Sequence, residues 1–572
     1  MKNLRIHIMF LFLLMQGIAC INAQVYDIPF SFCNPVNLNY RFQLDEPSRR
    51  EAADPMILLF KETYYLFASK SGGYWSSDDL IRWNFITTND LPLEDYAPTA
   101  VVIEDAVYFM AMDKRIYKST RPETGKWEVV KEDLPIRNPG DPALFLDDDG
   151  RLYLYSGLSN FLPIFGVELD RKTFDPIGEQ VECVHTNRED YGWERNGDYN
   201  TELKRKPWIE GAWMNKHNGK YYFQYAVPGT SFKSYADGCY VSDSPLGPFK
   251  LAENNPFAYK PEGFICGAGH GSTFTDKWGN LWHVGTMTIS VKHKFERRIG
   301  LFPAFFDKNG VFYTYTGFGD FPHILPQTKI NGPEDYQPAG MLLSYNKPVE
   351  VSSSMPEHPK ENATNEEIRN YWSAQTGNKG EWLTIDLQNP CQVSSIQINF
   401  AEEGSTLLDR PAVDYHQYLL EYSNDKKTWK TIANKQSNST SVPHDYLELK
   451  TPVAARYIRL TNHHIPDGKF AISGLRVFGK GNGRLPQTAT SFTAERNPED
   501  ACQVKLQWTK SPDAIGYNIR YGTHPDKLYQ NYQVLETDCL NINSLNRHQK
   551  YYFTIDSFNE NGITQGEKII EG

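Results

Sequence analysis

A fivefold repeat in the first 330 residues is the feature that most constrains the fold of this chain. Each copy begins at a short motif, runs into an apolar strand and a polar turn, and continues into a second strand that carries an aromatic residue. The first two spacings match a four-stranded propeller blade of roughly 40–45 residues. The later spacings are longer, which indicates insertions around residues 181–205 and 230–263. The residues that begin the five copies are Asp54, Ala97, Asp141, Glu210 and His270.

The repeat predicts one antiparallel sheet per copy. Gly, Asn and Asp turns between β-rich runs are frequent here, and helical periodicity is almost absent. We therefore expect a five-bladed β-propeller over residues 24–330, with the inner strands of all blades around one axis. The long insertions are expected to line the binding face.

Two further stretches of short alternating strands follow the repeat. Residues 338–480 contain runs such as 381–387 and 455–460, and residues 486–572 contain runs such as 504–508. This pattern is typical of β-sandwiches. The predicted fold class is thus all-β: a five-bladed propeller followed by two β-sandwich modules.

The composition bears on the partners of the chain. The formal net charge is −11, and Lys and Arg do not gather into a stripe. Because nucleic-acid binding depends on clustered positive side chains that face phosphate, this composition argues against nucleic acid as a partner. Aromatic residues make up 14% of the chain, which favours β structure and sugar-facing surfaces.

The first residues are predicted to be a targeting segment. Lys2 and Arg5 precede an apolar run, and Ala23 offers a small-residue cleavage site, so residues 1–23 are interpreted as a signal peptide. In an alternative interpretation, Cys20 is the lipidated first residue of a surface lipoprotein. The apolar run is too short for a spanning helix, and no later segment is predicted to cross a membrane. Either interpretation predicts an exported protein, in the periplasm, on the cell surface or secreted.

The remaining cysteines are scattered without CxxC spacing. Their odd count and low density argue against a disulfide scaffold. Two interpretations of Cys502 and Cys539 are possible: they form a disulfide within the last module, or they are free thiols.

Three carboxylates begin the first, third and fourth copies of the repeat. A propeller brings the inner strands of its blades around one axis, so Asp54, Asp141 and Glu210 should converge although they are far apart in sequence. Hydrolysis of a glycosidic bond needs an acid that protonates the leaving oxygen and a base that activates water. Two carboxyl groups can fill these roles where their surroundings push their pKa values apart. A single Asp-Pro at a strand start is more often a turn signal, but three acids at matching places favour function.

The motifs at these positions resemble glycoside hydrolase family 43. The likeness covers roughly residues 40–327 and rests on Ala53-Asp54-Pro55, Gly140-Asp141-Pro142-Ala143, Ile209-Glu210-Gly211 and Gly269-His270-Gly271-Ser272. The resemblance implies a five-bladed propeller and an inverting mechanism. It also implies that Asp54 is the general base, Asp141 the residue that tunes the pKa of the acid, and Glu210 the general acid.

The resemblance also points to residues around the acids. His270 matches an axial histidine that binds water or a calcium ion in the family, and its alternative is a core histidine. Arg297 is the better match to a family arginine near the sugar, with Arg298 as the rival. Trp75 and Trp213 are candidates for stacking on sugar, or else packing residues of the blades. No cofactor is expected to be required, although a structural calcium ion is considered at His270.

The tail resembles modules that accompany such enzymes. Residues 338–480 are similar to a discoidin-like (coagulation-factor type C) domain, and residues 486–572 to a fibronectin type III domain. The run 147–150 lacks the alternating spacing and the closing glutamate of a calcium loop, so it is predicted to be a hairpin turn.

The expected function follows from the resemblance. It is an inverting exo-glycosidase that removes terminal α-L-arabinofuranosyl residues from plant-type polysaccharides or oligosaccharides. Alternatives within the same chemistry are a β-D-xylosidase and a hydrolase directed at galactan or arabinan. An alternative of another class is a non-catalytic lectin that adheres to glycans. Three acids at matching positions argue against the lectin.

Overall fold

The computed structural model describes residues 24–27, 29–92 and 94–572 of the chain. In this part the regular elements are strands, joined by loops and four 3₁₀ helices of three or four residues. The all-β prediction is confirmed. None of the helices described here has the length and apolar character needed to cross a membrane. The predicted signal peptide and Cys20 lie outside the described residues.

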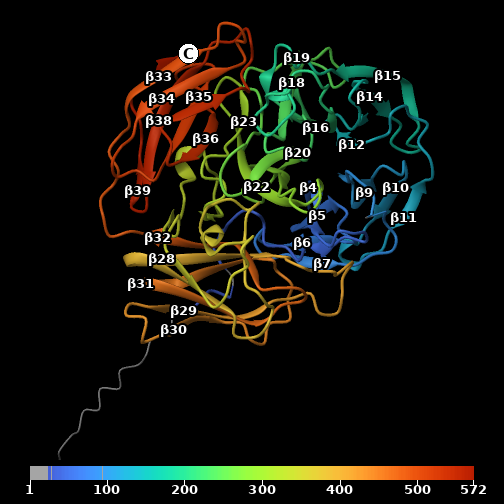
Figure 1. Ribbon diagram of the computed structural model, residues 1–572. Coiled ribbons are helices and arrows are strands. Elements are labelled where there is room, and N and C mark those ends of the chain that lie inside the picture. Colours follow the sequence, from blue (N-terminus) through green and yellow to red (C-terminus); the bar gives the residue numbers. More distant parts are fainter. Residues whose placement is uncertain (1–23, 28, 93) are drawn as a thin grey trace, which may run out of the picture.

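Five four-stranded antiparallel sheets follow one another along the first part of the chain (Figure 1). Within each sheet the strands are joined in sequence order by hairpins, as the repeat predicts. The strands are β4 (Ala53–Phe60), β5 (Thr63–Ser69), β6 (Tyr74–Ser77) and β7 (Asn84–Ile86); β8 (Thr99–Ile103), β9 (Ala106–Met110), β10 (Ile116–Ser119) and β11 (Glu128–Lys131); β12 (Ala143–Leu146), β13 (Leu152–Ser156), β14 (Ile164–Leu169) and β15 (Pro176–Val184); β16 (Glu210–His217), β17 (Lys220–Val227), β18 (Ala236–Ser242) and β19 (Lys250–Leu251); β20 (Cys266–Thr275), β21 (Leu281–Thr288), β22 (Arg297–Phe306) and β23 (Phe312–Thr314).

The five sheets form a closed ring. The first strand of each sheet lies against the first strand of the next, and β20 of the last sheet lies against β4 of the first. Apolar side chains fill the space between each pair of neighbouring sheets, which gives five cores rather than one. Inner strands such as β20 are therefore buried along almost their whole length. This ring brings the starts of β4, β12, β16 and β20 together at one end.

The second part of the chain forms a β-sandwich around an apolar core of its own. Its two longest strands span 20 and 21 residues and pair with each other along most of their length, so they hold the module together. The strands are β25 (Met341–Leu342), β26 (Val349–Val351), β27 (Trp372–Ser373), β28 (Trp382–Ala401), β29 (Gln417–Ser423), β30 (Lys430–Asn434), β31 (His444–His464) and β32 (Ala471–Lys480).

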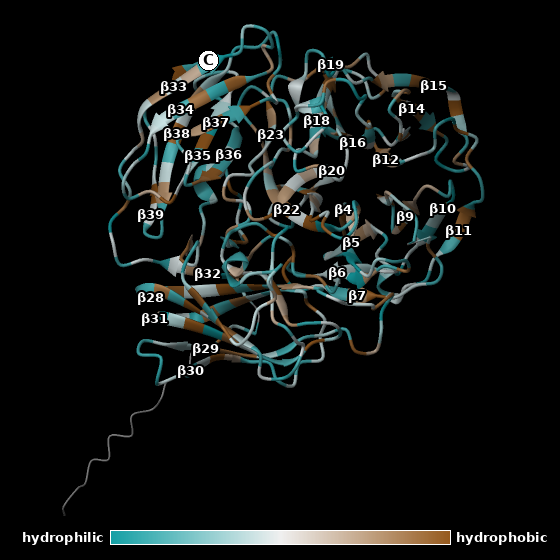
Figure 2. Ribbon diagram, in the orientation of Figure 1, coloured by the Kyte–Doolittle hydropathy of each residue, from teal (hydrophilic) through white to brown (hydrophobic). Residues whose placement is uncertain are grey.

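The last part of the chain is a second, smaller sandwich of a three-stranded and a five-stranded sheet. Buried and exposed residues alternate strictly along β34, as the sequence pattern predicts, and Figure 2 shows hydrophobic and hydrophilic residues mixed along these strands. Trp508 lies in its core. The strands are β33 (Thr490–Arg496), β34 (Val504–Thr509), β35 (Gly516–Gly522), β36 (Gln530–Leu535), β37 (Cys539–Ile542), β38 (Tyr552–Asn559), β39 (Gly562–Thr564) and β40 (Ile570–Glu571).

Both sandwiches pack directly against the ring. The last sandwich holds the segment that precedes β16: Arg195 forms an ion pair of 2.5 Å with Asp500, and the indole N–H of Trp193 donates to Asn546 at 2.9 Å. The other sandwich contacts the ring through Arg50, whose guanidinium lies 2.6 Å from Glu402. All seven cysteines of the described residues are free thiols, so the Cys502–Cys539 pairing is wrong.

Two short strand pairs complete the lead-in and the linker. β1 (Ser31–Phe32) pairs with β24 (His323–Ile324), and β2 (Arg41–Phe42) pairs with β3 (Arg50–Glu51). The first pair ties the start of the described chain to the segment that leaves the ring. The second pair places Glu51 three residues before Asp54, at the end of the ring where the first strands begin.

Candidate active site

The same backbone feature occurs at the start of all five sheets. One residue there adopts a left-handed conformation: φ is 50° at Asp54, 52° at Ala97, 48° at Asp141, 61° at Gly211 and 42° at His270. The strand register shifts at this point in the first, fourth and fifth sheets, as in a β-bulge. Left-handed backbone costs a residue other than glycine about 1–3 kcal/mol. Its presence at four such residues shows that the ring imposes this geometry.

Glu210 is therefore not at the position that matches the other acids. Gly211 carries the left-handed conformation in the fourth sheet, so Glu210 corresponds to Ala53 and Gly269, one residue earlier. Gly211 is required because a Cβ there would lie 2.7 Å from the His270 ring. The equivalence of Glu210 with Asp54, predicted from the repeat, is wrong by one residue, and Glu210 reaches the centre from a different direction.

Asp54 lies in surroundings that favour its ionised form. Ser69 donates from Oγ to Asp54 Oδ2 at 2.6 Å, and Arg297 Nη1 lies 3.2 Å from Oδ1. Burial acts to raise the pKa of Asp54, but the positive charge of Arg297, the nearby His270 ring and the hydrogen bonds outweigh it and leave the pKa below its usual value. Asp54 is consequently a carboxylate at neutral pH.

Arg297 is shared between two acids. It is 3% exposed, and its Nε and Nη2 lie 3.1 and 2.5 Å from Glu51 Oε1 while Nη1 faces Asp54. Arg298 points the other way, as neighbours on a strand do, and its Nε contacts His444 of the adjacent sandwich at 2.8 Å. Of the two candidate arginines, the structure places Arg297 beside the acids and Arg298 in a domain interface.

His270 connects the acids. Its Nδ1 lies 3.3 Å from Asp54 Oδ1 and 3.7 Å from Asp141 Oδ2. Burial lowers the pKa of His270 more than the Asp54 charge raises it, so the ring is neutral at neutral pH. A neutral imidazole can donate one hydrogen bond here without adding charge.

Glu210 and Asp141 are both pushed toward their protonated forms. Burial raises the pKa of Glu210 to about 7, and the charge of Asp54 adds to this rise, whereas a hydrogen bond from Tyr235 OH at 2.6 Å opposes it. Burial also raises the pKa of Asp141, and repulsion by Glu210 raises it further. Because two neighbouring buried carboxyls resist carrying two charges, this pair retains a proton at neutral pH.

Two site residues were missed by sequence reasoning. Tyr235, which donates to Glu210, and Asp237, whose Oδ2 accepts the Gly271 N–H at 3.1 Å, both belong to the third strand of the fourth sheet or the loop before it. Asp237 is fully buried, burial raises its pKa, and it supports the bulge that carries His270. Neither follows a repeated motif, so only the hairpin geometry could have revealed them.

The two tryptophans proposed to stack on sugar are packed among apolar side chains of the ring. Trp75 is 0% exposed, packs in the core between the fifth and first sheets, and donates from Nε1 to Asn39 at 2.6 Å. Trp213 is partly buried between two cores and donates to the Thr273 carbonyl at 3.1 Å. The stacking prediction for Trp75 is wrong because the neighbouring sheet covers its ring, and Trp213 is likewise held as a packing residue. Trp208, by contrast, is 45% exposed.

No group of three or more His, Cys, Asp and Glu side chains in the described ranges is arranged to hold a metal ion. The Nδ1 atom of His270 faces the carboxyl groups of Asp54 and Asp141. At the turn 147–150, Lys216 lies 2.6 Å from Asp147 and Arg151 lies 2.7 Å from Asp149. The run is a hairpin turn between β12 and β13, as predicted, with its acids paired to cations.

Comparison with known proteins agrees with this architecture. The family model described as glycosyl hydrolases family 43 matches residues 48–312, and the F5/8 type C domain model matches residues 348–473. Residues 48–312 are a glycosyl hydrolases family 43 domain. The ring of sheets and the convergent acids belong to this domain, and the first sandwich contains the F5/8 type C domain.

The family 43 domain is similar in sequence to three enzymes of microbial origin. A β-D-galactofuranosidase of Aspergillus niger is 27% identical over 39% of this chain and 70% of the relative. A β-xylosidase of Xylanibacter ruminicola is 31% identical over 21% of this chain and 42% of the relative. A xylosidase/arabinosidase of Bacteroides ovatus is 30% identical over 19% of this chain and 38% of the relative. The matched stretches thus cover less than half of two of these relatives.

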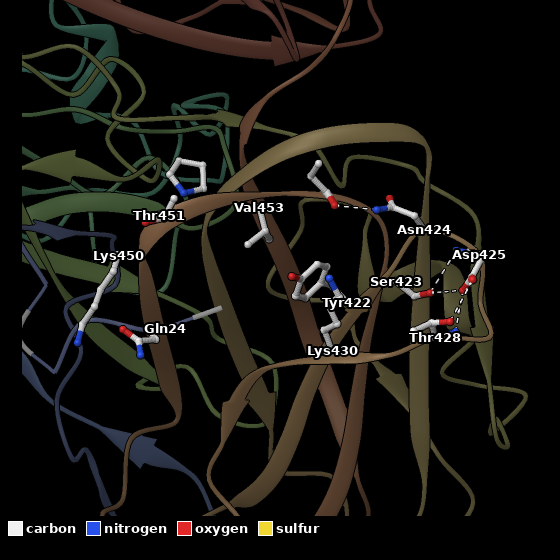
Figure 3. A pocket seen from close by; sticks show the side chains of 12 residues that line it. Gln24, Tyr422, Ser423, Asn424, Asp425, Thr428, Lys430, Lys450, Thr451 and Val453 are labelled. Atoms are coloured by element: carbon white, nitrogen blue, oxygen red, sulfur yellow. Dashed lines mark hydrogen bonds between the residues drawn. The ribbon is translucent and has the colours of Figure 1, made fainter. Parts of the chain in front are cut away.

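A separate surface cavity of about 520 Å³ lies in the F5/8 type C part of the chain (Figure 3). Asp425, Lys430 and Lys450 contribute to its lining. The Asp425 carboxylate accepts hydrogen bonds from the Thr428 hydroxyl and from backbone N–H groups. The cavity holds no pair of carboxyls with opposed pKa shifts, so the hydrolytic chemistry is assigned to the family 43 domain instead.

Proposed function

We propose that the protein is an inverting exo-glycosidase that removes terminal α-L-arabinofuranosyl residues from plant polysaccharides. The observation that carries this proposal is the opposed ionisation of two acids in one buried cluster: Asp54 is held as a carboxylate, while the pKa of Glu210 is raised to about 7. An inverting glycosidase needs this pair, one to accept a proton and one to donate it.

In the proposed reaction, Asp54 accepts a proton from a water molecule as the water oxygen attacks the anomeric carbon. Glu210 donates its proton to the glycosidic oxygen as the bond between that oxygen and the anomeric carbon breaks. Asp141 shares a proton with Glu210, because burial and the charge of Glu210 raise the pKa of Asp141. His270 lies between Asp54 and Asp141 and orients them. Arg297 holds Asp54 ionised and in place.

The preference for a furanoside rests on the relatives. One is named a β-D-galactofuranosidase and another a xylosidase/arabinosidase. The ring of β-D-galactofuranose has the configuration of α-L-arabinofuranose with one further exocyclic carbon, so one pocket can suit both. Because another relative is named a β-xylosidase, β-D-xylose is the alternative sugar. A hydrolase directed at galactan or arabinan would use the same chemistry.

The first test measures 4-nitrophenol release from α-L-arabinofuranoside, β-D-galactofuranoside, β-D-xyloside and β-D-galactopyranoside substrates. We expect the α-L-arabinofuranoside to be hydrolysed fastest, and Glu210→Gln to lower the turnover of natural polysaccharide about 10²–10⁴-fold. The loss on the aryl substrate is expected to be smaller, because nitrophenolate leaves without protonation. Equal losses on both substrates would contradict the role of Glu210 as the acid.

The pH dependence of kcat offers a second test. Because Glu210 must carry its proton, and burial raises its pKa to about 7, activity should fall as the pH rises through about 7. The hydrogen bond from Tyr235 stabilises the charged form of Glu210 and thereby lowers the pKa of Glu210. Tyr235→Phe removes this bond, so the pKa of Glu210 should rise. The alkaline limb should therefore move to higher pH in this variant. A limb that moves to lower pH would show that another group sets it.

We infer the remaining assignments from the same observations. The five sheets are interpreted as the five blades of a propeller, and residues 486–572 as a fibronectin type III-like sandwich. Residues 1–23 are proposed to direct export, with cleavage after Ala23 or lipidation of Cys20 as the two routes. A structural calcium ion remains a hypothesis, and its test is a calcium titration followed by the thermal midpoint of the protein.

A non-catalytic lectin would share the fold and part of the site. It would bind glycan without releasing sugar, and substitution of Asp54 or Glu210 would leave its function unchanged. Release of arabinose, galactose or xylose from a polysaccharide by wild-type protein, lost on Glu210→Gln, would exclude this alternative.

A further inference from the structure

An exposed apolar patch borders the acids. Trp208 is 45% exposed, Phe161 75% and Leu162 51%, and exposed apolar side chains that gather in one place mark binding surfaces. The three residues come from two segments, the loop between β13 and β14 and the end of the insertion before β16. We call these three residues the aromatic ledge.

The loop of the ledge is anchored next to both Asp141 and Glu210. The Gly157 N–H donates to the carbonyl of Gly140 at 2.7 Å, one residue before Asp141. Ser159 exchanges two backbone hydrogen bonds, of 3.1 and 2.8 Å, with Ile209, one residue before Glu210. The Ser159 hydroxyl then accepts the N–H groups of Phe161 and Leu162, each at 3.0 Å. The ledge is thus held in place rather than free to move.

Trp208 lies on the same side of its segment as Glu210. Side chains two residues apart in extended chain point to the same side, and Ile209 between them is 3% exposed and faces the core. On the Phe161 side, the Lys206 ammonium lies 4.9 Å from the Phe161 ring centroid. The ledge is therefore a surface that begins beside Glu210 and continues outward over the third sheet.

Other parts of the rim are covered by the F5/8 type C part of the chain. Arg369 forms an ion pair with Asp198 at 2.9 Å, and Lys233 contacts Glu367 at 2.5 Å. Beside the first sheet, the Arg410 guanidinium donates to the Ser71 carbonyl at 3.2 Å. These contacts occupy the rim next to the first and fourth sheets, whereas the three residues of the ledge are exposed to solvent.

We propose that the aromatic ledge binds the main chain of the polysaccharide, and that this main chain is built of pyranose rings. This inference rests on the proposed function, since Glu210 protonates the oxygen that leaves with the main chain. Chair-form pyranoses present flat C–H faces that stack on Trp and Phe, whereas the puckered furanose rings of an arabinan offer less continuous faces. The ledge thus selects arabinofuranosyl side chains on a pyranose backbone such as xylan.

The test compares wild type with Trp208→Ala and Phe161→Ala on wheat arabinoxylan, sugar-beet arabinan and 4-nitrophenyl α-L-arabinofuranoside. We expect each substitution to lower kcat/KM on arabinoxylan, relative to kcat/KM on the aryl glycoside, by about tenfold. The ratio for arabinan against the aryl glycoside should change less than about threefold. A control is Trp278→Ala, since Trp278 is 51% exposed in the turn between β20 and β21, at the other end of the fifth sheet.

The outcomes separate this inference from the proposed function. If wild type releases no sugar from any substrate, the proposed function fails. If wild type is active but the ratio of kcat/KM on arabinoxylan to that on the aryl glycoside stays within about twofold of wild type in both variants, the ledge does not bind a pyranose main chain. The same conclusion follows if the ratio for arabinan falls as far as the ratio for arabinoxylan. Binding to insoluble arabinoxylan gives a second readout, measured as the loss of Glu210→Gln protein from solution. The double variant Glu210→Gln/Trp208→Ala should stay in solution to a larger extent.

Discussion

Asp54→Asn is expected to lower kcat about 10²–10⁴-fold on every substrate, including aryl glycosides. The asparagine side chain has the size of aspartate and can still accept the Ser69 hydroxyl, so the fold of the site should persist. It cannot take a proton from water, however. Among the described acids of this site, Asp54 has a lowered pKa, whereas the pKa values of Asp141 and Glu210 are raised. Arg297 keeps Glu51 as its partner, which limits the electrostatic cost of the change.

The matched control for this prediction is Asp105→Asn. Asp105 is an exposed acid in the turn between β8 and β9, at the other end of the second sheet from the acids. Steady-state kinetics on 4-nitrophenyl α-L-arabinofuranoside should show no change for this variant. If Asp54→Asn keeps kcat within about tenfold of wild type, Asp54 is not the general base. This experiment also distinguishes the base from the acid, because only the acid variant should spare activated aryl substrates.

Trp193→Ala is expected to destabilise the protein by about 3–5 kcal/mol, the range for a buried tryptophan that leaves a cavity. Trp193 is 0% exposed and lies between Tyr191, at a ring separation of 6.1 Å, and Tyr225, at 5.8 Å. Its packing is tight enough that a Cβ on Gly238 would lie 2.2 Å from the indole ring. The substitution also removes the hydrogen bond to Asn546 of the last sandwich.

The measurement is the thermal midpoint by calorimetry, together with the rate of proteolysis in residues 185–209. Several modules are present, so the midpoint is read as a comparison between variants rather than as a two-state free energy. Trp278→Ala serves again as the control, because an exposed residue changes stability by roughly 0.5 kcal/mol or less. An unchanged midpoint and unchanged proteolysis in Trp193→Ala would show that the last sandwich does not hold this insertion.

Stability and activity should be linked through the same insertion. It runs from β15 to β16 and ends at Trp208 and Glu210. The ion pair of Arg195 with Asp500 and the packing of Trp193 fix it against the last sandwich. The last sandwich therefore supports the geometry of the candidate acid, in addition to any role in binding glycan.

The repeat and its acids could be read from the sequence because their signals are local. Strand alternation and turn residues recur within each copy, and the starting motifs fall at the start of each first strand. Once a ring was inferred, the convergence of Asp54 and Asp141 followed. The choice between Arg297 and Arg298 needed the structure, because it depends on which way β22 faces.

Other features escaped the sequence because they depend on distant neighbours. Trp75 looks like an aromatic platform in sequence, but the fifth sheet covers its ring. The offset of Glu210 by one residue arises from a bulge whose register only strand pairing reveals. Tyr235 and Asp237 carry no motif and reach the acids through a hairpin and a neighbouring strand.

The sequence by itself determined the strands, the number of repeated units and which residues could carry acid–base chemistry, since these depend on side-chain type and short-range periodicity. The tertiary structure alone decided how each acid behaves. Asp54 and Asp141 share a residue type and a left-handed backbone, yet the pKa of one is lowered and that of the other raised. The reason is that burial disfavours charge at both, and only Asp54 has the Arg297 guanidinium in direct contact to overcome it.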